Sequence, residues 1–515
     1  MAVSVLPEKL LLSGVEIESP QSMGSVSGAE SFVTVIYPWD GSTEVGRANL
    51  LGIEQLGLVH QRIEQGSQRF AQTTRAQRLQ ILESLIRRLD ESKEQLARLI
   101  TLETGKPIRY ARMEVRYGLS VLKAYRQVDV WEKHERLVLP DALSADVAQT
   151  QSVEVLTWPI GGILAVLPYS FSLGLAIEQL APALVSGCSL ALKPSSKAPL
   201  SAMLLGRLAV QAGYSAMSVL PCQPYVAEQL MQLSCFKRRF FAGSLAVARH
   251  LQAQGHAVGL MQRQSSFQLA GYGVCLVDDF PTPPDPYSAY DFSSEYSVSD
   301  LLDESESYTG EGTLTAEQIV QMIAQSAFGF SGQMAGATQR ILVNHQCYDA
   351  FLKAFLEQAR QMKVGDPMKD DTDMGPMATT DAVFYTRNLI KETIRAGANV
   401  LYGGNTFNTY TMNPTVFNRT TPEMTLNHQF VPAPIVTIAP YESLDDVVAG
   451  LQSQTHFLQQ VSLYCNDSVA INQMKQTLNV PTLHVNQTRP FLSDVLLPVQ
   501  VAERMAAYSH SRLVM

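Results

Sequence analysis

Hydrophobic residues recur at helical spacing in the first third of the chain. The stripe after residue 75 consists of Leu79, Leu82, Ile86 and Leu89. This spacing places the four side chains on one face of a helix and leaves most of the neighbouring Arg and Glu residues on the other faces. Ser92 followed by Gln95 is typical of a capping box and predicts the start of the next helix. We expect that helix to end at Gly105, ahead of Pro107.

The pattern then changes from helical to extended. Residues 137–157 mix branched and polar side chains around Pro140, which predicts an extended hairpin. Short apolar runs and amphipathic segments alternate after it, and a second strand and helix series covers about 328–485. This order predicts an α/β fold, with parallel sheets covered by helices on both faces. In the first series we expect strands at 162–167, 189–193, 218–220 and 239–241, and helices at 173–185, 200–212 and 245–253.

An uncharged run from Val155 to Ile177 has to be weighed as a membrane span. Four helix breakers interrupt it: Pro159, Gly161, Gly162 and Pro168. A helix that crosses a bilayer rarely tolerates that density of Pro and Gly. We therefore expect a buried strand, a turn and the start of a helix there, and no membrane span.

The N-terminal region, residues 1–33, is rich in Ser, Gly and Pro, and we expect an irregular lead-in. It lacks a basic segment followed by a long apolar run and a small-residue cleavage site. The chain has six scattered cysteines with no CxxC pair, which predicts neither a zinc site nor a redox dithiol. Both features favour a cytoplasmic protein without a metal.

Composition fits a globular protein of two or three packed regions. The chain has 515 residues, of which 46% are hydrophobic and 17% charged, so it is not a disordered sequence. Its formal net charge of -9 argues against nucleic acid as a partner.

The most unusual stretch is acidic. No Lys or Arg occurs between Arg263 and Arg340, and residues 281–313 combine many carboxylates with Ser, Pro and Tyr. This composition predicts an acidic loop inserted between the two strand and helix series. It is either a solvated surface insertion or a docking segment for a protein partner, whose interface its tyrosines would anchor.

Several segments, taken together in this order, resemble the aldehyde dehydrogenase superfamily over roughly residue 34 to the C-terminus. The segments that carry the resemblance are Glu103-Thr-Gly-Lys-Pro107, Gly162 to Lys193 followed by Pro-Ser, Phe241-Ala-Gly-Ser244, Gly332-Gln333, Val364-Gly-Asp-Pro, Thr372-Asp-Met-Gly-Pro376 and Asn413-Pro-Thr-Val416.

The resemblance implies three parts and a homo-oligomer, a dimer or a tetramer. The expected parts are a Rossmann-like cofactor-binding domain at 34–136 and 158–270, a β-hairpin oligomerisation arm at 137–157 and about 486–515, and an α/β catalytic-type domain at 271–485 that contains the acidic insertion 281–313.

The positions that would carry the family's chemistry have changed. The family nucleophile is the Cys of Gly-Gln-x-Cys, and Ala335 stands there. A methyl group cannot attack a carbonyl, and loss of a covalent nucleophile typically costs orders of magnitude in rate. The family base is a Glu, replaced by Gln268, whose amide takes no proton near neutral pH. The usual oxyanion Asn is Ser170, which can still donate a hydrogen bond over a shorter reach.

The cofactor positions have changed unevenly. Lys193, which in the family bonds the adenine ribose, is kept, and Ser196 replaces the Glu that selects against a 2′-phosphate. Gly243 and Ser244 open a predicted helix whose amides favour phosphate. The Glu that holds the nicotinamide ribose in the family is Phe430 here, and the family's substrate loop is missing between residues 491 and 501.

These losses leave three hypotheses. The chain is a catalytically inactive scaffold or binding protein that needs no cofactor, a sensor that still binds NAD or NADP without turnover, or an NAD(P)-dependent oxidoreductase with an atypical mechanism. Lys193 and Ser244 fit both simple inheritance of the fold and residual nucleotide binding.

Overall fold

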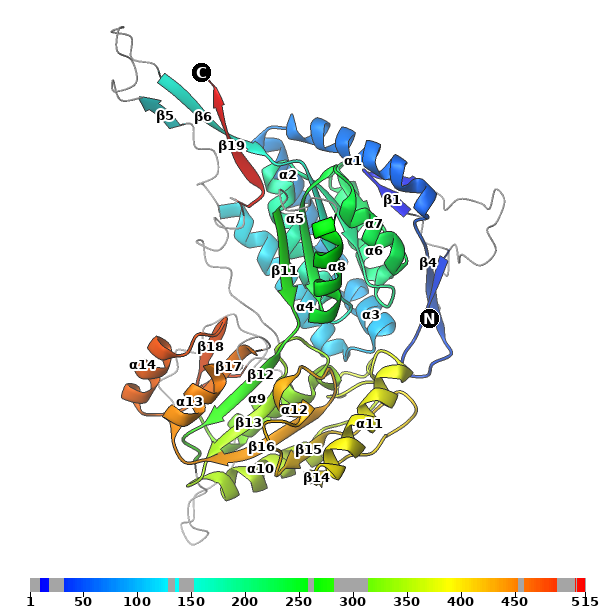
Figure 1. The fold of residues 1–515 in the computed structure, drawn as a ribbon. Helices are drawn as coiled ribbons and strands as arrows, with labels where there is room; N and C mark the ends of the chain where they lie inside the picture. The colour runs from blue at the N-terminus through cyan, green and yellow to red at the C-terminus, as the bar shows by residue number, and fades with distance from the viewer. Residues whose placement is uncertain are drawn as a thin grey trace.

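The structure consists of two α/β bodies and an extended arm (Figure 1). A seven-stranded sheet forms the centre of each body. The computed structural model describes residues 10–17, 32–127, 135–138, 152–257, 264–281, 314–452, 458–488, 505 and 507–514. Of the acidic segment expected at 281–313, only Pro281 belongs to the described residues.

The first sheet has the strand order β11-β10-β7-β8-β9-β1-β2, and β7 to β11 are parallel where they pair. Successive residues of β7 point to opposite faces, so Ile163 packs into the core cluster on one side and Leu164 into the cluster on the other. The elements are β7 (Gly162–Val166), α5 (Ser172–Ser186), β8 (Ser189–Lys193), α6 (Pro199–Gln211), β9 (Met217–Val219), α7 (Pro224–Gln232), β10 (Phe236–Gly243), α8 (Leu245–Ala257) and β11 (Gln264–Leu269).

Part of the N-terminal region is regular, which corrects the expectation of an irregular lead-in over 1–33. Strands β1 (Leu10–Leu12) and β2 (Val15–Ile17) form an antiparallel hairpin that extends the first sheet beyond β9. The hairpin turn is fixed by the backbone amide of Ser13, which donates to Ser218 Oγ at 2.8 Å. Leu11 and Leu12 are buried, so apolar burial offsets the cost of ordering this segment.

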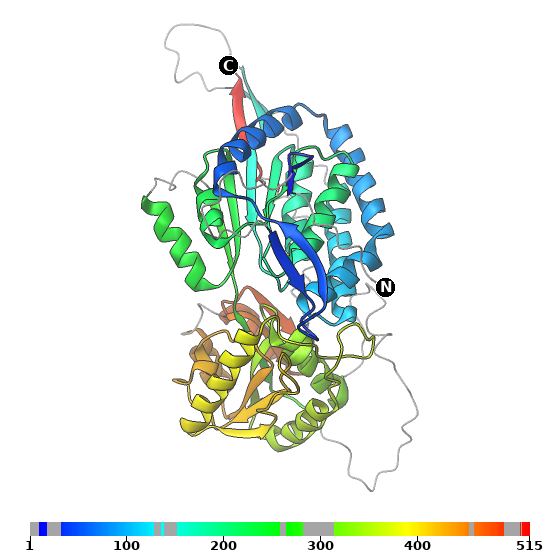
Figure 2. The ribbon, with the colours of Figure 1, turned by 90° about the vertical axis from the view of Figure 1, so that its right-hand side faces the viewer.

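A layer of helices covers the first sheet (Figure 2). The capping box lies at Thr74 and Gln77 rather than at Ser92, because α2 runs straight into α3 and leaves Ser92 without a side-chain cap bond. Gly105 ends α3 with φ of 76°, a conformation that glycine adopts without strain. The remaining elements before the arm are β3 (Phe32–Ile36), β4 (Glu44–Asn49), α1 (Leu56–Ala71), α2 (Arg75–Glu91), α3 (Lys93–Thr104) and α4 (Ile108–Ala124).

The second sheet has the order β14-β15-β16-β13-β12-β17-β18, and all its neighbouring strands are parallel except β14 with β15. Helices lie on both of its faces. Its elements are β12 (Tyr272–Val277), α9 (Ala316–Phe328), β13 (Thr338–Asn344), α10 (Tyr348–Gln361), α11 (Thr380–Arg395), β14 (Asn399–Tyr402), β15 (Thr415–Asn418), α12 (Thr425–His428), β16 (Ile435–Tyr441), α13 (Leu444–Gln452), β17 (Leu458–Tyr464), α14 (Ser468–Thr477) and β18 (Thr482–Val485).

The arm is a three-stranded antiparallel sheet that projects from the first body (Figure 1). Strands β5 (Glu135–Val138) and β6 (Ser152–Pro159) pair with each other, and β19 (Ser509–Val514) pairs with the other edge of β6. The region expected to be an extended hairpin and the C-terminal tail therefore share one sheet.

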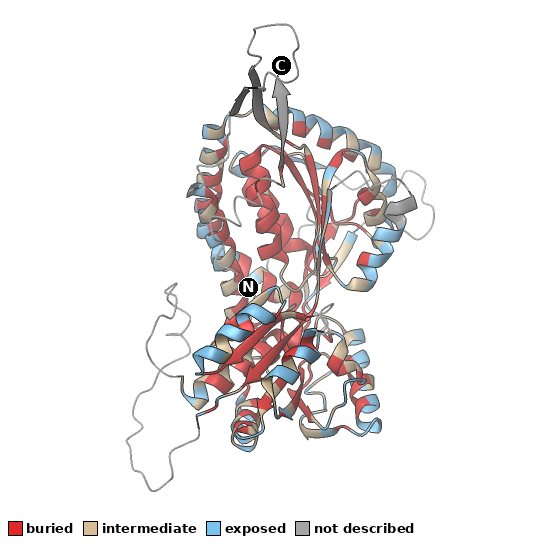
Figure 3. Ribbon diagram, turned by 60° about the vertical axis from the view of Figure 1, so that its left-hand side comes forward, coloured by how far each residue is buried: buried red, intermediate tan, exposed pale blue. Residues whose placement is uncertain are grey.

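The uncharged run from Val155 to Ile177 covers the end of β6, strand β7 and the first half of α5. All fifteen residues of α5 are buried, and the helix lies inside the first body (Figure 3). Burial inside the protein explains the lack of charge there. Among the helices that the structure describes, none is long and apolar enough to span a bilayer.

Candidate functional site

Three backbone segments from the two bodies meet at one place. They are the loop after β7 with Ser170, the turn before β13 with Ala335, and the connection from β11 to β12 that follows Gln268. The amide of Gly336 donates to Gly271 O at 2.8 Å, which ties the second segment to the third. The hydroxyl of Tyr169 donates to Gln333 Oε1 at 3.1 Å, which ties the first to the second. The structure thus brings the neighbourhoods of the three changed catalytic positions together.

The turn before Ala335 has an unusual backbone. Phe330 and Ser331 have φ of 49° and 55°, and Gly332 follows with φ of 65°. Left-handed conformations are costly for residues with a Cβ and persist where the surroundings fix them. Ser331 Oγ donates to the carbonyl of Gly375 at 2.6 Å, which supplies one such constraint.

Gln333 anchors this turn from inside. Its amide nitrogen donates to the carbonyls of Phe330 and Pro376 at 3.2 and 3.4 Å. Its amide oxygen accepts from Tyr169 and from the backbone of Ala378, the latter at 2.9 Å. A glutamine with both ends bonded and 2% of its surface exposed has a structural role that does not depend on catalysis.

Ala335 itself is partly exposed, and its side chain is a methyl group. All six cysteines of the chain are unpaired and buried. Burial raises the pKa of each thiol, to about 11 for Cys188, Cys222 and Cys465 and to about 12 for Cys235. The pKa values of Cys275 and Cys347 are raised for the same reason. A thiolate, the reactive form, is therefore disfavoured at every cysteine.

A buried ion pair supports the loop that carries Ser170. The Lys106 ammonium pairs with Glu114 and donates to the Ser170 carbonyl at 2.7 Å. Glu114 also accepts the backbone amides of Leu173 and Gly174, at 2.8 and 3.1 Å, at the start of α5. Burial lowers the pKa of Lys106, and the Glu114 carboxylate opposes that shift. A negative charge at a helix N-terminus is stabilising, so this pair fixes both the loop and the helix.

Aromatic and sulfur-containing side chains fill the space beside the turn. Lys106 Nζ lies 5.0 Å from the centre of the Phe330 ring and 5.5 Å from that of Phe171. Burial raises the pKa of the Tyr169 phenol to about 12. The cluster comprises Tyr110, Met113, Tyr169, Phe171, Phe330, Met334 and Ala337.

Gln268 lies near the end of β11, opposite Ala242 of β10, and is half-buried. A carboxamide at this place keeps hydrogen-bonding capacity but takes up no proton at neutral pH. The next residue, Leu269, accepts a hydrogen bond from the side chain of Gln459 at 2.5 Å, which fixes the segment that leads to Gly271.

The adenosine side of the expected cofactor site is recognisable. Lys193 ends β8 and Gly243 ends β10, so both lie at the carboxyl edge of one parallel sheet, where α/β folds bind ligands. Burial lowers the pKa of Lys193. Ser196 and Ser244 are exposed, and Ser244 Oγ accepts the amide of Val247 at 3.4 Å in the first turn of α8. These residues fit an adenosine phosphate.

The residue expected to hold the nicotinamide ribose of the cofactor does not fit that group. Phe430 is half-buried and packs against the apolar cluster of the second body that contains Tyr272 and Val274. Its loop is anchored by Gln339, which accepts the Val431 amide at 2.9 Å and donates to the Gln429 carbonyl at 2.6 Å. A phenyl ring offers no acceptor to a ribose hydroxyl.

Sequence reasoning did not find the Lys106–Glu114 pair. Lys106 belongs to the segment Glu103 to Pro107, which we used only as a family signature. Both side chains of the pair are fully buried, and composition does not predict which charged residues are buried. Within the part of the chain that the structure describes, no group of three or more His, Cys, Asp or Glu side chains could hold a metal.

Two Rossmann-like bodies with a site at their junction, together with a projecting three-stranded arm, define the class of aldehyde dehydrogenase folds. The sequence model of the Aldehyde dehydrogenase family matches residues 25–279 and 313–499. The chain therefore belongs to this family, whose members are NAD(P)-dependent. The two matched segments leave out residues 280–312, which nearly coincide with the acidic stretch.

Similar proteins include enzymes with different aldehyde substrates. The chain is 29% identical over 364 residues to a mitochondrial succinate-semialdehyde dehydrogenase of Oryza sativa subsp. japonica, covering 69% of this chain and 60% of the relative. It is 25% identical over 437 residues to a sulfoacetaldehyde dehydrogenase of Neptuniibacter caesariensis, covering 84% and 86%. The chain thus spans less than two thirds of the length of the rice relative.

Solved structures share the whole fold. An aldehyde dehydrogenase from Physcomitrella patens, solved with the reaction product succinate, superposes with a TM-score of 0.81 at 21% identity, covering 99% of this chain and 98% of that one. Apo betaine aldehyde dehydrogenase from Staphylococcus aureus gives 0.80 at 17% identity, covering 99% and 95%. At these identities the likeness establishes the fold.

Proposed function

We propose that this member of the aldehyde dehydrogenase family does not oxidise aldehydes and acts as a structural, binding or regulatory component of an assembly. The observation that carries the proposal is the methyl group of Ala335 at the position of the family nucleophile. No thiol in the chain compensates for it, since all six cysteines are buried and have raised pKa values.

The residues at the expected oxyanion and base positions also favour the absence of aldehyde oxidation. Oxidation to an acid needs a thiolate that adds to the carbonyl, donors for the oxyanion and a base that activates water for thioester hydrolysis. Ser170 offers one hydroxyl donor, whereas Gln268 offers no base. An atypical route, direct hydride removal from an aldehyde hydrate, would still need a base to take the hydrate proton.

The contacts that hold the candidate site together favour an assembly role. Gln333, Lys106 and Glu114 keep the turn before Ala335 and the loop with Ser170 in place without any reactive group. The arm places β5 and β19 at the two edges of its sheet. Exposed strand edges pair readily, so we expect the arm to join copies of the chain into a dimer or a tetramer. The six unpaired cysteines fit a cytoplasmic location.

Residual nucleotide binding is a second candidate function, favoured by one arrangement. Lys193 and the Gly243–Ser244 turn lie at the same edge of the first sheet, and Ser196 beside them carries no charge. Bound NAD or NADP would supply a hydride acceptor. These residues would hold its adenosine half, whereas Phe430 offers nothing to the nicotinamide ribose.

A thermal-shift titration separates the two candidates. A ligand present at a hundred times its dissociation constant stabilises the folded state by about 2.7 kcal/mol. NAD or NADP at millimolar concentration should therefore raise the melting temperature if the sensor candidate holds. Unchanged melting with both nucleotides removes that candidate and leaves the scaffold proposal, which needs no cofactor.

A further inference from the structure

One lysine at the junction of the two bodies has no role in the site described above. Lys197 follows β8 in the connection to α6, and its side chain is partly buried. Its Nζ atom lies 5.0 Å from the centre of the Tyr169 ring. Tyr169 precedes Ser170 in the loop after β7, so Lys197 approaches the candidate site from a second loop of the first body.

The contacts of Tyr169 place this ammonium beside the turn that leads to Ala335. The Tyr169 hydroxyl donates to Gln333 Oε1 at 3.1 Å, and the same oxygen accepts the Ala378 amide at 2.9 Å. Gln333 precedes Ala335 by two residues, and Ala378 precedes the first residue of α11 by two. Lys197 therefore lies where the loop after β7, the turn before β13 and the start of α11 converge.

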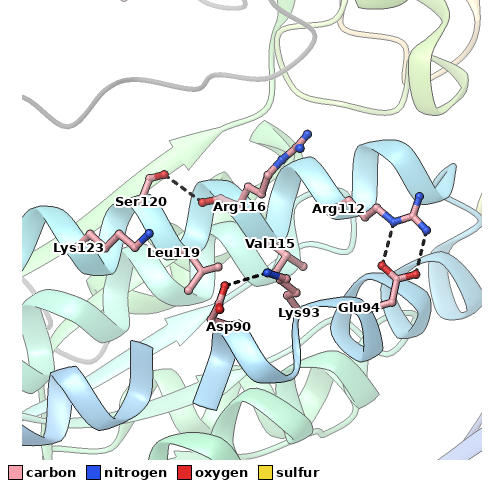
Figure 4. A pocket seen from close by; sticks show the side chains of 9 residues that line it. All are labelled: Asp90, Lys93, Glu94, Arg112, Val115, Arg116, Leu119, Ser120 and Lys123. Atoms are coloured by element: carbon pink, nitrogen blue, oxygen red, sulfur yellow. Dashed lines mark hydrogen bonds and ion pairs between the residues drawn. The ribbon is translucent and has the colours of Figure 1, made fainter. Parts of the chain in front are cut away.

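No carboxylate of the described residues forms an ion pair with the Lys197 ammonium. An exposed lysine such as Lys93, on the outside of the first body, pairs with Asp90 at 3.2 Å (Figure 4). The carboxylate whose charge acts on Lys197 is that of Asp381, in the first turn of α11. An aromatic face replaces the lost hydration of an ammonium only in part. The charged form of Lys197 is therefore poorly compensated.

These surroundings favour a neutral amine. Burial, the larger cause, lowers the pKa of Lys197, and the Asp381 carboxylate opposes that shift. Burial also lowers the pKa of Lys106 and of Lys193. Lys106 is fully buried and paired with Glu114, and Lys193 stands at the position that bonds the adenine ribose in the family. Lys197 is partly exposed and has neither of these tasks.

A partly desolvated lysine in a cleft is a nucleophile for carbonyl groups. We propose that Lys197 captures aldehydes as imines, which gives the chain a carbonyl-binding group although position 335 carries none. Aldehydes are the substrates of the family to which the chain belongs. The side chain is partly exposed, so a small aldehyde can reach the amine beside the Tyr169 ring.

The reaction balances without a cofactor. The nitrogen lone pair forms a bond to the carbonyl carbon, and one proton moves from nitrogen to oxygen, which gives a carbinolamine. The hydroxyl then leaves as water with the second nitrogen proton, and a C=N bond remains. No electron acceptor takes part, so imine formation needs neither NAD nor NADP. It is independent of the proposed loss of aldehyde oxidation, and failure of either proposal leaves the other untouched.

Reductive trapping on the unchanged chain tests the proposal. The chain is incubated at neutral pH with succinic semialdehyde and sodium cyanoborohydride, which reduces an imine to a stable secondary amine. Peptide mass spectrometry then compares the labelling rates of individual lysines. We expect Lys197 to be labelled about tenfold faster than Lys353 and Lys391, because exposed lysines are almost fully protonated at neutral pH. Labelling of Lys197 at the rate of these two lysines, or preferential labelling of Lys193, overturns the proposal.

A charge-conserving variant separates the amine from its charge. Lys197→Arg keeps a cation beside Tyr169 but has no amine that forms an imine, so the fast phase of labelling should disappear. Lys353→Arg, at an exposed position of α10, is the matched control and should keep the fast phase. A fast phase that persists in Lys197→Arg contradicts the proposal. The measurement on the unchanged chain stands even if this variant fails to fold.

An uncharged aldehyde excludes simple attraction of an anion. Succinic semialdehyde carries a carboxylate that any cation attracts, whereas propanal carries no charge. The preference for Lys197 should hold with both aldehydes, because it follows from the reactivity of the amine. A preference confined to the acidic aldehyde would show an anion site in place of a reactive amine, and would overturn the proposal.

Discussion

The Lys106 ammonium, in the connection between α3 and α4, donates to the carbonyl oxygen of Ser170, in the loop between β7 and α5, at 2.7 Å. The same ammonium pairs with the buried Glu114. The backbone at Ser170, where the family resemblance expects the oxyanion donor, is therefore held by a charged group that is fully buried. Ala335, expected at the nucleophile position, carries only a methyl group.

Loss of one partner of this pair should be strongly destabilising. Lys106→Met leaves the Glu114 charge buried, and we expect the free energy of unfolding to fall by about 3–5 kcal/mol. In Lys106→Met with Glu114→Gln, the amide oxygen still accepts the α5 amides, so part of the loss should be recovered. Lys353→Met, at an exposed position of α10, is the surface control. Urea unfolding that shows no difference between Lys106→Met and that control would contradict this account of the pair.

A second buried carboxyl should give the stability a defined pH dependence. Glu103 accepts the amides of Leu200 and Ser201 at 2.9 and 3.2 Å at the start of α6. Burial, the main cause, raises the pKa of Glu103 from 4.5 to about 8. The folded state thus holds a proton that the unfolded state releases, and this contribution to stability is lost as the pH rises from about 4.5 through 8.

Glu103→Gln isolates that contribution. The variant has no titrating group at this position, so it should gain stability relative to the unchanged chain as the pH rises from 6 to about 9. Urea unfolding at several pH values measures the difference. A difference that stays constant over this range would show that Glu103 keeps an ordinary pKa.

The thiols should be unreactive in the folded chain. Reaction with an aromatic disulfide reagent should show no fast-reacting thiol in the native protein and six after denaturation, because all six cysteines are buried. Ala335→Cys should add one fast-reacting thiol, since position 335 is partly exposed. A fast thiol in the unchanged chain would mean that another cysteine reaches solvent.

If NAD or NADP binds, the residue at position 196 should determine whether NADP is accepted. Its hydroxyl leaves room for a 2′-phosphate, whereas Ser196→Glu places a like charge beside it. We expect the variant to lose the thermal shift with NADP and to keep the one with NAD. Equal loss of both shifts would place the adenosine ribose away from Ser196.

Much of the fold could be predicted from sequence because local patterns dictate it. The strand ending at Lys193 and the helix that ends before Gly105 follow from apolar runs and from a glycine that adopts a positive φ. The hairpin at Leu11 could not be predicted, since its partner strand at Val219 lies some two hundred residues away. The capping box at Ser92 was wrong because the preceding helix continues to that residue.

The candidate site could be predicted only as a set of changed positions. Family motifs located Ala335, Gln268 and Ser170 in the sequence, and the contacts of Gly336 and Tyr169 explain why their neighbourhoods converge. The supporting bonds of Gln333 depend on backbone carbonyls and amides from distant loops. Residue types alone do not predict such hydrogen bonds.

The central claim is tested most directly by measuring NAD and NADP reduction at 340 nm with the purified chain and a panel of aldehydes that includes succinic semialdehyde and sulfoacetaldehyde. We expect no sustained reduction above that of a sample without protein. Sustained turnover that disappears in the Ser170→Ala, Gln268→Ala double variant would show that this site oxidises aldehydes without a thiol, and would contradict the account.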